Sequence, residues 1–171
     1  MPRSFYARPP VEVARDLLGC NLVHGPRAAR IVEVEAYLGL GDPPSHTSRG
    51  MTPRTKVIFG PPGHAYVYLI YGMYECLNFV TLPEGEPGCV LIRALEPVHG
   101  VELATNGPGR LTRAMGITRG HNGADLTTGD LRVLYGTHQE RVVCGPRVGI
   151  GLYPDLPLRY WLEGNAFVSR G

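Results

Sequence analysis

The chain has 171 residues, of which 43% are hydrophobic and 19% are charged, a composition that excludes a disordered or fibrous protein. This length is typical of one domain, which we expect to span residues 1–171 and to bury a core without a disulfide or a metal. The net charge of +2 does not by itself indicate a nucleic-acid partner, but Lys56 is the only lysine among 17 basic residues, and the planar guanidinium of the other 16 suits phosphate oxygens.

The first third of the chain predicts a helix, two strands and a long loop. Residues 11–18 place apolar side chains at helical spacing, and Gly19 follows them as a terminator. A short apolar run at residues 22–23 predicts a strand, and residues 30–37 (RIVEVEAY) predict a longer one. Residues 38–56 are rich in Gly, Pro, Ser and Thr, and they predict a loop that is too long to be a simple connection.

The rest of the chain predicts further strands around one short helix. Residues 64–82, interrupted by Gly72, predict a strand followed by a turn and then by a second strand or a bulge. Residues 89–94 predict a buried strand that ends at Glu96-Pro97. Residues 107–117 predict a glycine-led turn that opens a helix, and residues 131–135, 147–151 and 159–162 predict three more strands. We therefore expect an α+β fold: a single compact domain built on a curved, mainly antiparallel sheet with flanking helices and a protruding hairpin.

The strand at residues 30–37 carries acidic side chains in alternation with apolar ones. Glu33, Glu35 and Tyr37 consequently share one face, and two carboxylates beside a phenol are typical of a general-base site. Either glutamate satisfies this pattern. A solvated strand face would satisfy it too.

Four tyrosines fall within residues 66–74. Tyr66 and Tyr68 face the same way on a strand, whereas Tyr71 lies toward the hairpin tip beside Met73. An aromatic side chain at an exposed tip is unusual unless it contacts a partner, and stacking on bases or wedging between them requires such a side chain. The alternative is that these are core tyrosines with bonded hydroxyls.

Arginines cluster in a later segment that is free of acidic residues. Arg110, Arg113 and Arg119 lie between Leu103 and Ala124, after glycine-rich backbone. Arginines and helix N-termini commonly bind phosphate, although a solvated basic face fits the same pattern.

The four cysteines form no CxxC pair and no cluster with zinc spacing, so we expect buried free thiols, no metal and no cofactor. The N-terminus lacks a basic region followed by an apolar run, and no stretch approaches 18 apolar residues. We therefore expect a soluble cytoplasmic protein. We also expect a monomer without an obligate protein partner.

Covalent catalysis through a Schiff base would need an amine. The only lysine, Lys56, lies in the long loop. Pro2 would present an amine if Met1 were removed, but no acidic residue follows it directly. The sequence therefore does not favour a Schiff-base step.

Several long motifs resemble those of the alkyladenine (3-methyladenine) DNA glycosylase family, whose members are monofunctional base-excision repair enzymes. The motifs are RIVEVEAYLG, TPR, YVYLIYGMYECLN and VLIRALEP, and the resemblance continues through RVGIG near the C-terminus. It covers nearly the whole chain. It implies an enzyme that flips alkylated or deaminated purines out of duplex DNA and hydrolyses the N-glycosidic bond, without a cofactor. For such an enzyme, the lack of a well-placed amine favours hydrolysis without lyase activity, and we expect it to associate with the nucleoid if its source is prokaryotic.

The resemblance also implies roles for individual residues. Glu35 matches the general base, and Arg93 matches the arginine that helps to hold the attacking water. We expect the carboxylate of Glu35 to share one water-accessible cavity with stacked tyrosines. The residues that match the base-binding pocket are Tyr37, His46, Tyr68 and Asn78, the last of which obstructs the exocyclic amine of normal guanine.

Outside the pocket, the resemblance implies contacts with DNA. Tyr71, with Met73 beside it, matches the tip that enters the minor groove and fills the gap left by the flipped nucleotide. Arg110 and Arg119 match positions near the DNA backbone.

Two other functions fit part of the pattern. A non-catalytic β-ribbon that binds nucleic acid would use the tyrosines and arginines but would leave Glu35 without a role. A sugar glycoside hydrolase would use Glu33 and Glu35 as a carboxylate pair about 6–7 Å apart. The single tryptophan, Trp161, is a small platform for a sugar, and the hairpin tip would be unexplained.

Overall fold

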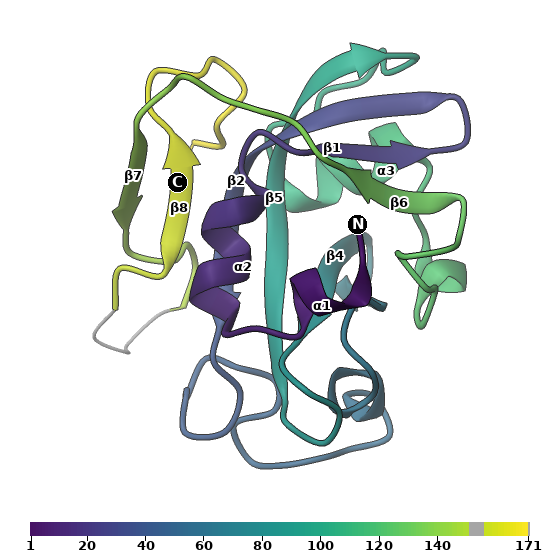
Figure 1. Cartoon of the computed structure of the whole chain (residues 1–171), viewed down its shortest axis with the longest axis vertical. Coiled ribbons are helices and arrows are strands. Elements are labelled where there is room, and N and C mark those ends of the chain that lie inside the picture. The colour runs from purple at the N-terminus through teal and green to yellow at the C-terminus, as the bar shows by residue number, and fades with distance from the viewer. Residues whose placement is uncertain (151–155, 171) are drawn as a thin grey trace.

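The computed structural model describes residues 1–150 and 156–170 (Figure 1). In these residues eight strands form one sheet with only antiparallel pairings. The strands are β1 (Asn21–His24), β2 (Arg27–Tyr37), β3 (Ala65–Ile70), β4 (Tyr74–Thr81), β5 (Gly88–His99), β6 (Leu131–Leu134), β7 (Val142–Gly145) and β8 (Arg159–Leu162). The helices are α1 (Arg3–Tyr6), α2 (Pro10–Leu17) and α3 (Pro108–Met115), with short 3₁₀ helices η1 (Lys56–Phe59) and η2 (Arg119–His121).

Strands β2 and β5 run side by side through the centre of the molecule (Figure 1). The sheet continues from β5 to β4 and β3 on one side. On the other side β2 pairs first with β1 and then, further along, with β8. Register shifts between Ile31 and Val34 mark a bulge in β2, and bulges bend a sheet. The result is the curved antiparallel sheet of a single α+β domain, as the sequence predicts.

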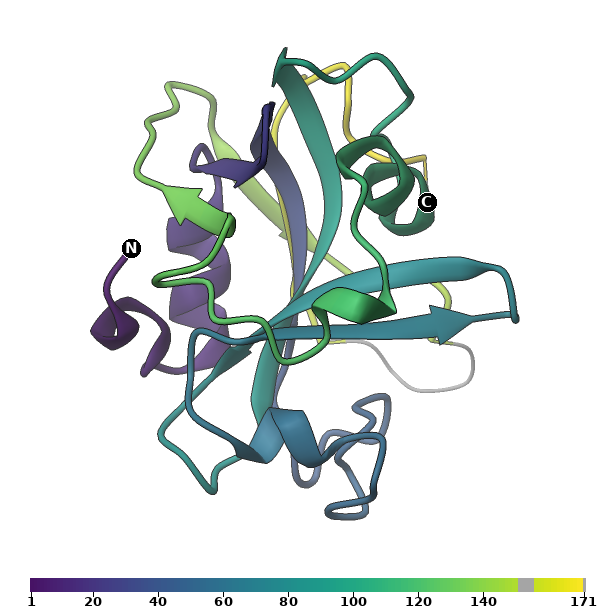
Figure 2. The ribbon, with the colours of Figure 1, turned by 90° about the vertical axis from the view of Figure 1, so that its right-hand side faces the viewer.

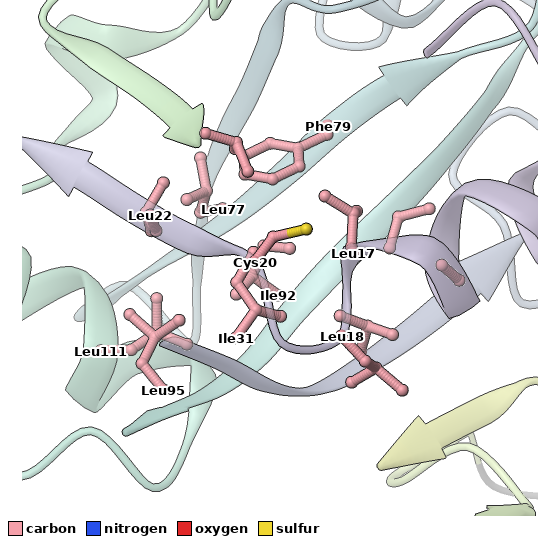
Figure 3. Packing of buried hydrophobic residues seen from close by; sticks show 14 of the residues in the cluster. Leu17, Leu18, Cys20, Leu22, Ile31, Leu77, Phe79, Ile92, Leu95 and Leu111 are labelled. Atoms are coloured by element: carbon pink, nitrogen blue, oxygen red, sulfur yellow. The ribbon is translucent and has the colours of Figure 1, made fainter. Parts of the chain in front are cut away.

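The two faces of the sheet bury different groups. The main hydrophobic core joins α2 and α3 to one face, where Leu17 and Leu111 pack with Ile92 from β5 (Figure 3). A second, smaller cluster contains Tyr66, Val80 and Cys89 together with Ile58 of η1, and Tyr37 and Tyr68 pack against it. Successive side chains of a strand point to opposite faces, so the alternation predicted for residues 30–37 separates the core from the tyrosines.

The hairpin β3–β4 projects sideways from the sheet (Figure 2). Its turn closes with a hydrogen bond from the Met73 amide to the Ile70 carbonyl, 3.2 Å long. The two central residues, Tyr71 and Gly72, have φ of 52° and 70°. Two consecutive positive φ values define the type I′ turn, whose twist matches that of the strands it joins. The predicted strand and turn are thus confirmed, and of the two alternatives for the segment after the turn the structure has the second strand.

Two boundaries predicted from the sequence are wrong. The strand predicted at residues 147–151 is not present at residues 147–150, which contain a turn. Position 151 lies outside the described residues. A strand lies earlier in the chain, at Val142–Gly145. Likewise β5 does not end at Glu96-Pro97 but continues to His99. Pro97 is accommodated because the pairing register with β2 shifts between Ala28 and Ala29, where Pro97 pairs. In the described part of the chain, no helix combines the length and apolar character needed to cross a membrane.

A buried ion pair ties the long loop after β2 to the C-terminal half of the chain. Arg147 donates from Nη1 and Nη2 to the two carboxylate oxygens of Asp42, at 2.8 and 2.9 Å. Arg147 Nη1 also donates to the Ala36 carbonyl at 3.2 Å, and the Leu38 amide donates to Asp42. Such a paired fork fixes both position and orientation, so the loop has a defined path over the sheet.

We predict that Asp42→Ala destabilises the protein by about 3–5 kcal/mol, because it leaves the Arg147 guanidinium buried without its carboxylate. The measurement is urea unfolding. The matched control is Asp16→Ala, which removes the exposed ion pair with Arg8 and should cost less than about 1 kcal/mol. Equal losses in the two variants would contradict the role assigned to the buried pair.

Candidate active site

Two buried glutamates share one arginine at the centre of the sheet. Glu33 and Glu35 of β2 are both 0% exposed, so the interpretation of this segment as a solvated strand face is wrong. Arg93 of β5 is also buried and reaches both of them. Its Nε lies 3.0 Å from Glu33 Oε1, and its Nη1 lies 3.2 Å from Glu35 Oε1.

Glu33 is surrounded by hydrogen-bond donors. Arg159 of β8 donates to Oε1 at 2.7 Å, and Ser169 donates its amide to Oε2 at 2.6 Å and its hydroxyl to Oε1 at 2.9 Å. With the bond from Arg93 included, Oε1 of Glu33 accepts three hydrogen bonds and Oε2 accepts one. Glu33 thereby ties β2, β5, β8 and the C-terminal segment together.

Glu35 has fewer partners and a perturbed acidity. Its Oε2 accepts the Tyr37 hydroxyl at 2.9 Å, and its Oε1 accepts the Val148 amide at 2.8 Å. Burial raises the pKa of Glu35, and the Arg93 charge and the hydrogen bonds from Val148 and Tyr37 oppose that rise in part. A carboxylate with a raised pKa is better suited to accept a proton near neutral pH than an ordinary one.

The cavity beside Glu35, which we term the tyrosine cavity, has a volume of about 40 Å³. Its lining includes the four predicted pocket residues, Tyr37, His46, Tyr68 and Asn78, and also Ser45, Ile58, Tyr66 and Cys89. The Tyr66 and Tyr68 rings stack with centroids 5.3 Å apart, and the His46 ring meets Tyr68 at 4.6 Å and 75°. The structure therefore brings the predicted pocket residues together, around room for roughly one or two waters.

Sheet register explains why these distant residues meet. Tyr66 pairs with Asn78, Asn78 with Leu91, and Leu91 with Glu35, so their side chains form one row across β3, β4, β5 and β2. Asn78 is buried and donates from Nδ2 to the Tyr66 carbonyl at 3.2 Å. The amide is thus fixed in orientation at the inner end of the cavity.

Glu35 itself does not line the tyrosine cavity. Tyr37 stands between them, with its ring on the cavity and its hydroxyl bonded to the carboxylate. Burial, followed by the charge of Glu35, raises the pKa of Tyr37, which keeps its hydroxyl a proton donor. The expectation that the carboxylate is open to water is therefore wrong for the free protein, because Glu35 is fully enclosed.

His46 reaches the cavity from the long loop. Its Nδ1 lies 3.1 Å from the Tyr66 hydroxyl. Burial against its neighbours and, second, the charge of Arg54 lower the pKa of His46 to about 4. The imidazole is therefore neutral at pH 7 and can both donate and accept a hydrogen bond.

A second hollow, which we term the hairpin groove, runs between the hairpin tip and the start of α3. It has a volume of about 560 Å³, and its lining includes Tyr71, Cys76, Arg93 and Arg110. Cys76 is the cross-strand partner of Tyr68, so the groove lies next to the tyrosine cavity. Arg93 lines the groove and contacts Glu35. The carboxylate thus lies between the two hollows.

The hairpin tip is open to solvent, as the sequence predicts. Tyr71 is 83% exposed and Met73 67% exposed. Tyr71 holds a left-handed φ of 52°, which is uncommon for a residue other than glycine and often marks a functional position.

The two predicted phosphate-contacting arginines do not belong to one helix. Arg110 lies in α3, lines the hairpin groove and donates to Asn106 at 3.0 Å. Arg119 lies in η2, is 62% exposed and pairs with Glu75 of β4 at 3.1 Å. The segment from Leu103 to Ala124, which has no acidic residue of its own, therefore forms an ion pair with an acidic side chain of β4.

Sequence reasoning missed several residues around the site. Tyr66 had a usable signal, because it shares a strand face with Tyr68. Arg159 and Ser169 had none, because their partner Glu33 lies 126 and 136 residues away in the chain. Three cysteines are buried, as predicted, but Cys144 is exposed. No group of three or more potential metal ligands occurs among the residues described.

A third hollow, similar in size to the hairpin groove with about 600 Å³, lies between the N-terminal segment and residues 135–138. None of the predicted site residues lines it. Size alone therefore does not identify the site, whereas the chemistry of the lining residues does.

Residues 4–166 match the family model described as Methylpurine-DNA glycosylase (MPG). Proteins named "Putative 3-methyladenine DNA glycosylase" are similar over nearly their full length. The protein of Methanoculleus marisnigri is 49% identical, with 99% of this chain and 98% of that protein covered. Those of Methanocella arvoryzae and Myxococcus xanthus are 50% and 48% identical, covering 94% and 100% of this chain and 90% and 94% of those proteins. The chain therefore belongs to the methylpurine-DNA glycosylase family.

Proposed function

We propose that this protein flips a damaged purine of the 3-methyladenine, 7-methylguanine, ethenoadenine or hypoxanthine class out of duplex DNA and hydrolyses its N-glycosidic bond. The product is an abasic site, and the protein acts as a monomer in the cytoplasm or on the nucleoid, without a cofactor. The observation that carries the proposal is the enclosed Glu35–Arg93 pair, which lies between the aromatic rings around the tyrosine cavity and a groove with basic side chains.

In this mechanism Glu35 is the general base. Among the described residues its Oε2 accepts only the Tyr37 hydroxyl, so a lone pair remains for a water that enters with the nucleotide. The water oxygen bonds to C1′ of the sugar, its proton passes to Glu35, and the electron pair of the N-glycosidic bond leaves with the purine. Arg93 holds the carboxylate in place. An alkylated purine with a positive charge needs little acid catalysis, because it is already a good leaving group.

The cavity walls favour damaged purines. A cationic ring on an aromatic face gains about 0.5–2 kcal/mol, so Tyr37 and Tyr68 would bind an alkylated purine better than a neutral one. Neutral His46 would bond to the base edge, and Asn78, fixed by the Tyr66 carbonyl, would obstruct the exocyclic amine of normal guanine. Weak pairing of a lesion adds selectivity, because flipping it costs less.

The surroundings of the cavity suit duplex DNA. Tyr71 and Met73 project from a rigid turn and would fill the space vacated by the flipped nucleotide. Arg110 in the hairpin groove and Arg119 on η2 would contact phosphates. The positions of the two candidate amines argue against a lyase step and in favour of hydrolysis. Lys56 lies at the start of η1, and Pro2 lines the separate N-terminal hollow.

The alternative functions account for less of the geometry. A sugar hydrolase needs two available carboxylates, but Glu33 is occupied by Arg93, Arg159 and Ser169. A non-catalytic DNA-binding ribbon needs the tyrosines and arginines but gives no reason for a buried Glu35. Release of free base from lesion-containing duplex separates an enzyme from both alternatives.

We predict that Glu35→Gln loses excision by at least about 100-fold, the scale of general-base catalysis. The amide oxygen can still accept the Val148 amide and the amide nitrogen can donate to Tyr37, so we expect the variant to fold and to bind lesion DNA. The measurement is single-turnover release of hypoxanthine, with Glu12→Gln on the exposed surface of α2 as the control. Full excision by the Glu35 variant would remove this residue from the mechanism.

The raised pKa of Glu35 predicts a pH dependence. The base must be deprotonated, so the single-turnover rate should fall as pH drops through the Glu35 pKa, and that midpoint should lie above the ordinary carboxyl value of 4.5. A pH profile with a neutral lesion such as hypoxanthine measures this. A rate that stays constant down to pH 4.5 is incompatible with the assignment.

We predict that Tyr71→Ala lowers excision from duplex DNA roughly 10-fold, because stacking of one ring on bases is worth about 1–3 kcal/mol. The thermal midpoint should change little, since the side chain is exposed. Tyr135→Ala is the matched control, because that tyrosine is 67% exposed on the N-terminal hollow. Equal activity of the two variants on duplex DNA would argue against insertion.

A further inference from the structure

Arg54 does not line the tyrosine cavity itself, but its guanidinium lies against two of the rings that do, Tyr68 and His46. Its Cζ lies over the Tyr68 ring, 5.0 Å from the centroid. Its Nη2 lies 3.3 Å from His46 Nε2 and 3.5 Å from His46 Nδ1. One nitrogen at similar distances from both ring nitrogens forms a short, directed hydrogen bond with neither. Arg54 therefore packs on the aromatic rings as a planar cation.

A comparison with Arg147 shows that Arg54 is held weakly. Arg147 also lies over a cavity ring, 4.7 Å from the centroid of Tyr37, but it is buried and bound to both oxygens of Asp42. Arg54 is exposed, and no carboxylate of the described residues lies within ion-pair distance of it. Its position thus depends on cation–π attraction and on polar contacts with His46 and the Tyr66 hydroxyl, and not on an ion pair, so it can be given up at smaller cost than that of Arg147.

Arg54 occupies the place that a stacked base requires. Tyr68 and His46 are the two rings proposed to hold a purine, and the guanidinium contacts both. The cavity that remains has about 40 Å³, enough for roughly one or two waters and too little for a purine ring. A base that stacks on the face of Tyr68 covered by Arg54 must displace the guanidinium.

We propose that Arg54 is a specificity-determining residue that occupies the base site of the free protein and must be displaced by every flipped base. This inference rests on the proposed function of the cavity. The cost of displacement is the same for all bases, but its effect on the observed rate differs. A lesion that binds strongly stays almost fully inserted and loses little rate, whereas an undamaged purine, inserted only in a small fraction of complexes, loses rate in proportion. Arg54 thus suppresses excision of normal purines.

Binding of free 3-methyladenine to the protein alone tests the competition without DNA. We expect Arg54→Ala to bind it roughly 3- to 30-fold more tightly than the unaltered protein, the range that loss of a cation–π contact gives. Arg49→Ala removes the same charge from the same loop without touching Tyr68 or His46, and it should bind like the unaltered protein. Isothermal titration calorimetry measures all three proteins.

The outcomes separate this inference from the proposed function. Equal or weaker binding by Arg54→Ala, with clear binding by the unaltered protein, would overturn the role of Arg54 and leave the cavity as a base site. Binding by none of the three proteins would overturn both.

A second measurement follows the consequence for selectivity. In single-turnover assays Arg54→Ala should release undamaged guanine from duplex DNA several-fold faster than the unaltered protein, with hypoxanthine release changed less than about two-fold. If the variant instead lost activity on both bases and its DNA affinity depended less on salt, Arg54 would be a phosphate contact and the inference would be wrong.

Discussion

The sharing of the Arg93 guanidinium by Glu33 and Glu35 is the constraint on which the site depends. Two carboxylates that are 0% exposed would repel each other, and each buried ion costs several kcal/mol in lost hydration. Arg93 and Arg159 balance both charges, and Ser169 supplies two more hydrogen bonds to Glu33. Three strands and the C-terminal segment must therefore meet at one point. Glu33 is the member of the pair with more hydrogen bonds, and Glu35 is the member that we propose as the general base.

The sheet separates stability from function. One face packs Leu17, Ile92 and Leu111 into the main core (Figure 3), while the opposite face carries the cross-strand row from Tyr66 to Glu35. The site is consequently held by strands and not by loops alone. The long loop contributes Ser45 and His46 to the cavity lining and places Arg54 against Tyr68, and it is itself tied down by the pair of Asp42 and Arg147. The free protein is closed, so a nucleotide has to open it.

Features set by neighbouring residues could be predicted from the sequence, and features set by distant partners could not. The type I′ turn depends on residues 70–73 alone, and the exposed Tyr71 follows from it. The alternation of residues 30–37 gives the shared face of Glu33 and Glu35, but their burial depends on Arg93 and Ser169, at least 58 residues away from either glutamate. The sequence predicts a strand at residues 147–151, because it does not reveal that Arg147 pairs with Asp42, 105 residues earlier. Arg119 looked unpaired because Glu75 lies in another strand.

The most direct test of the account is a crystal structure of the Glu35→Gln variant bound to a duplex that contains hypoxanthine. The account predicts the purine between Tyr68 and His46, C1′ facing residue 35 with a water between them, and Tyr71 in the vacated stack. A base bound outside the tyrosine cavity, or a Tyr37 hydroxyl that still separates residue 35 from the sugar, would contradict it.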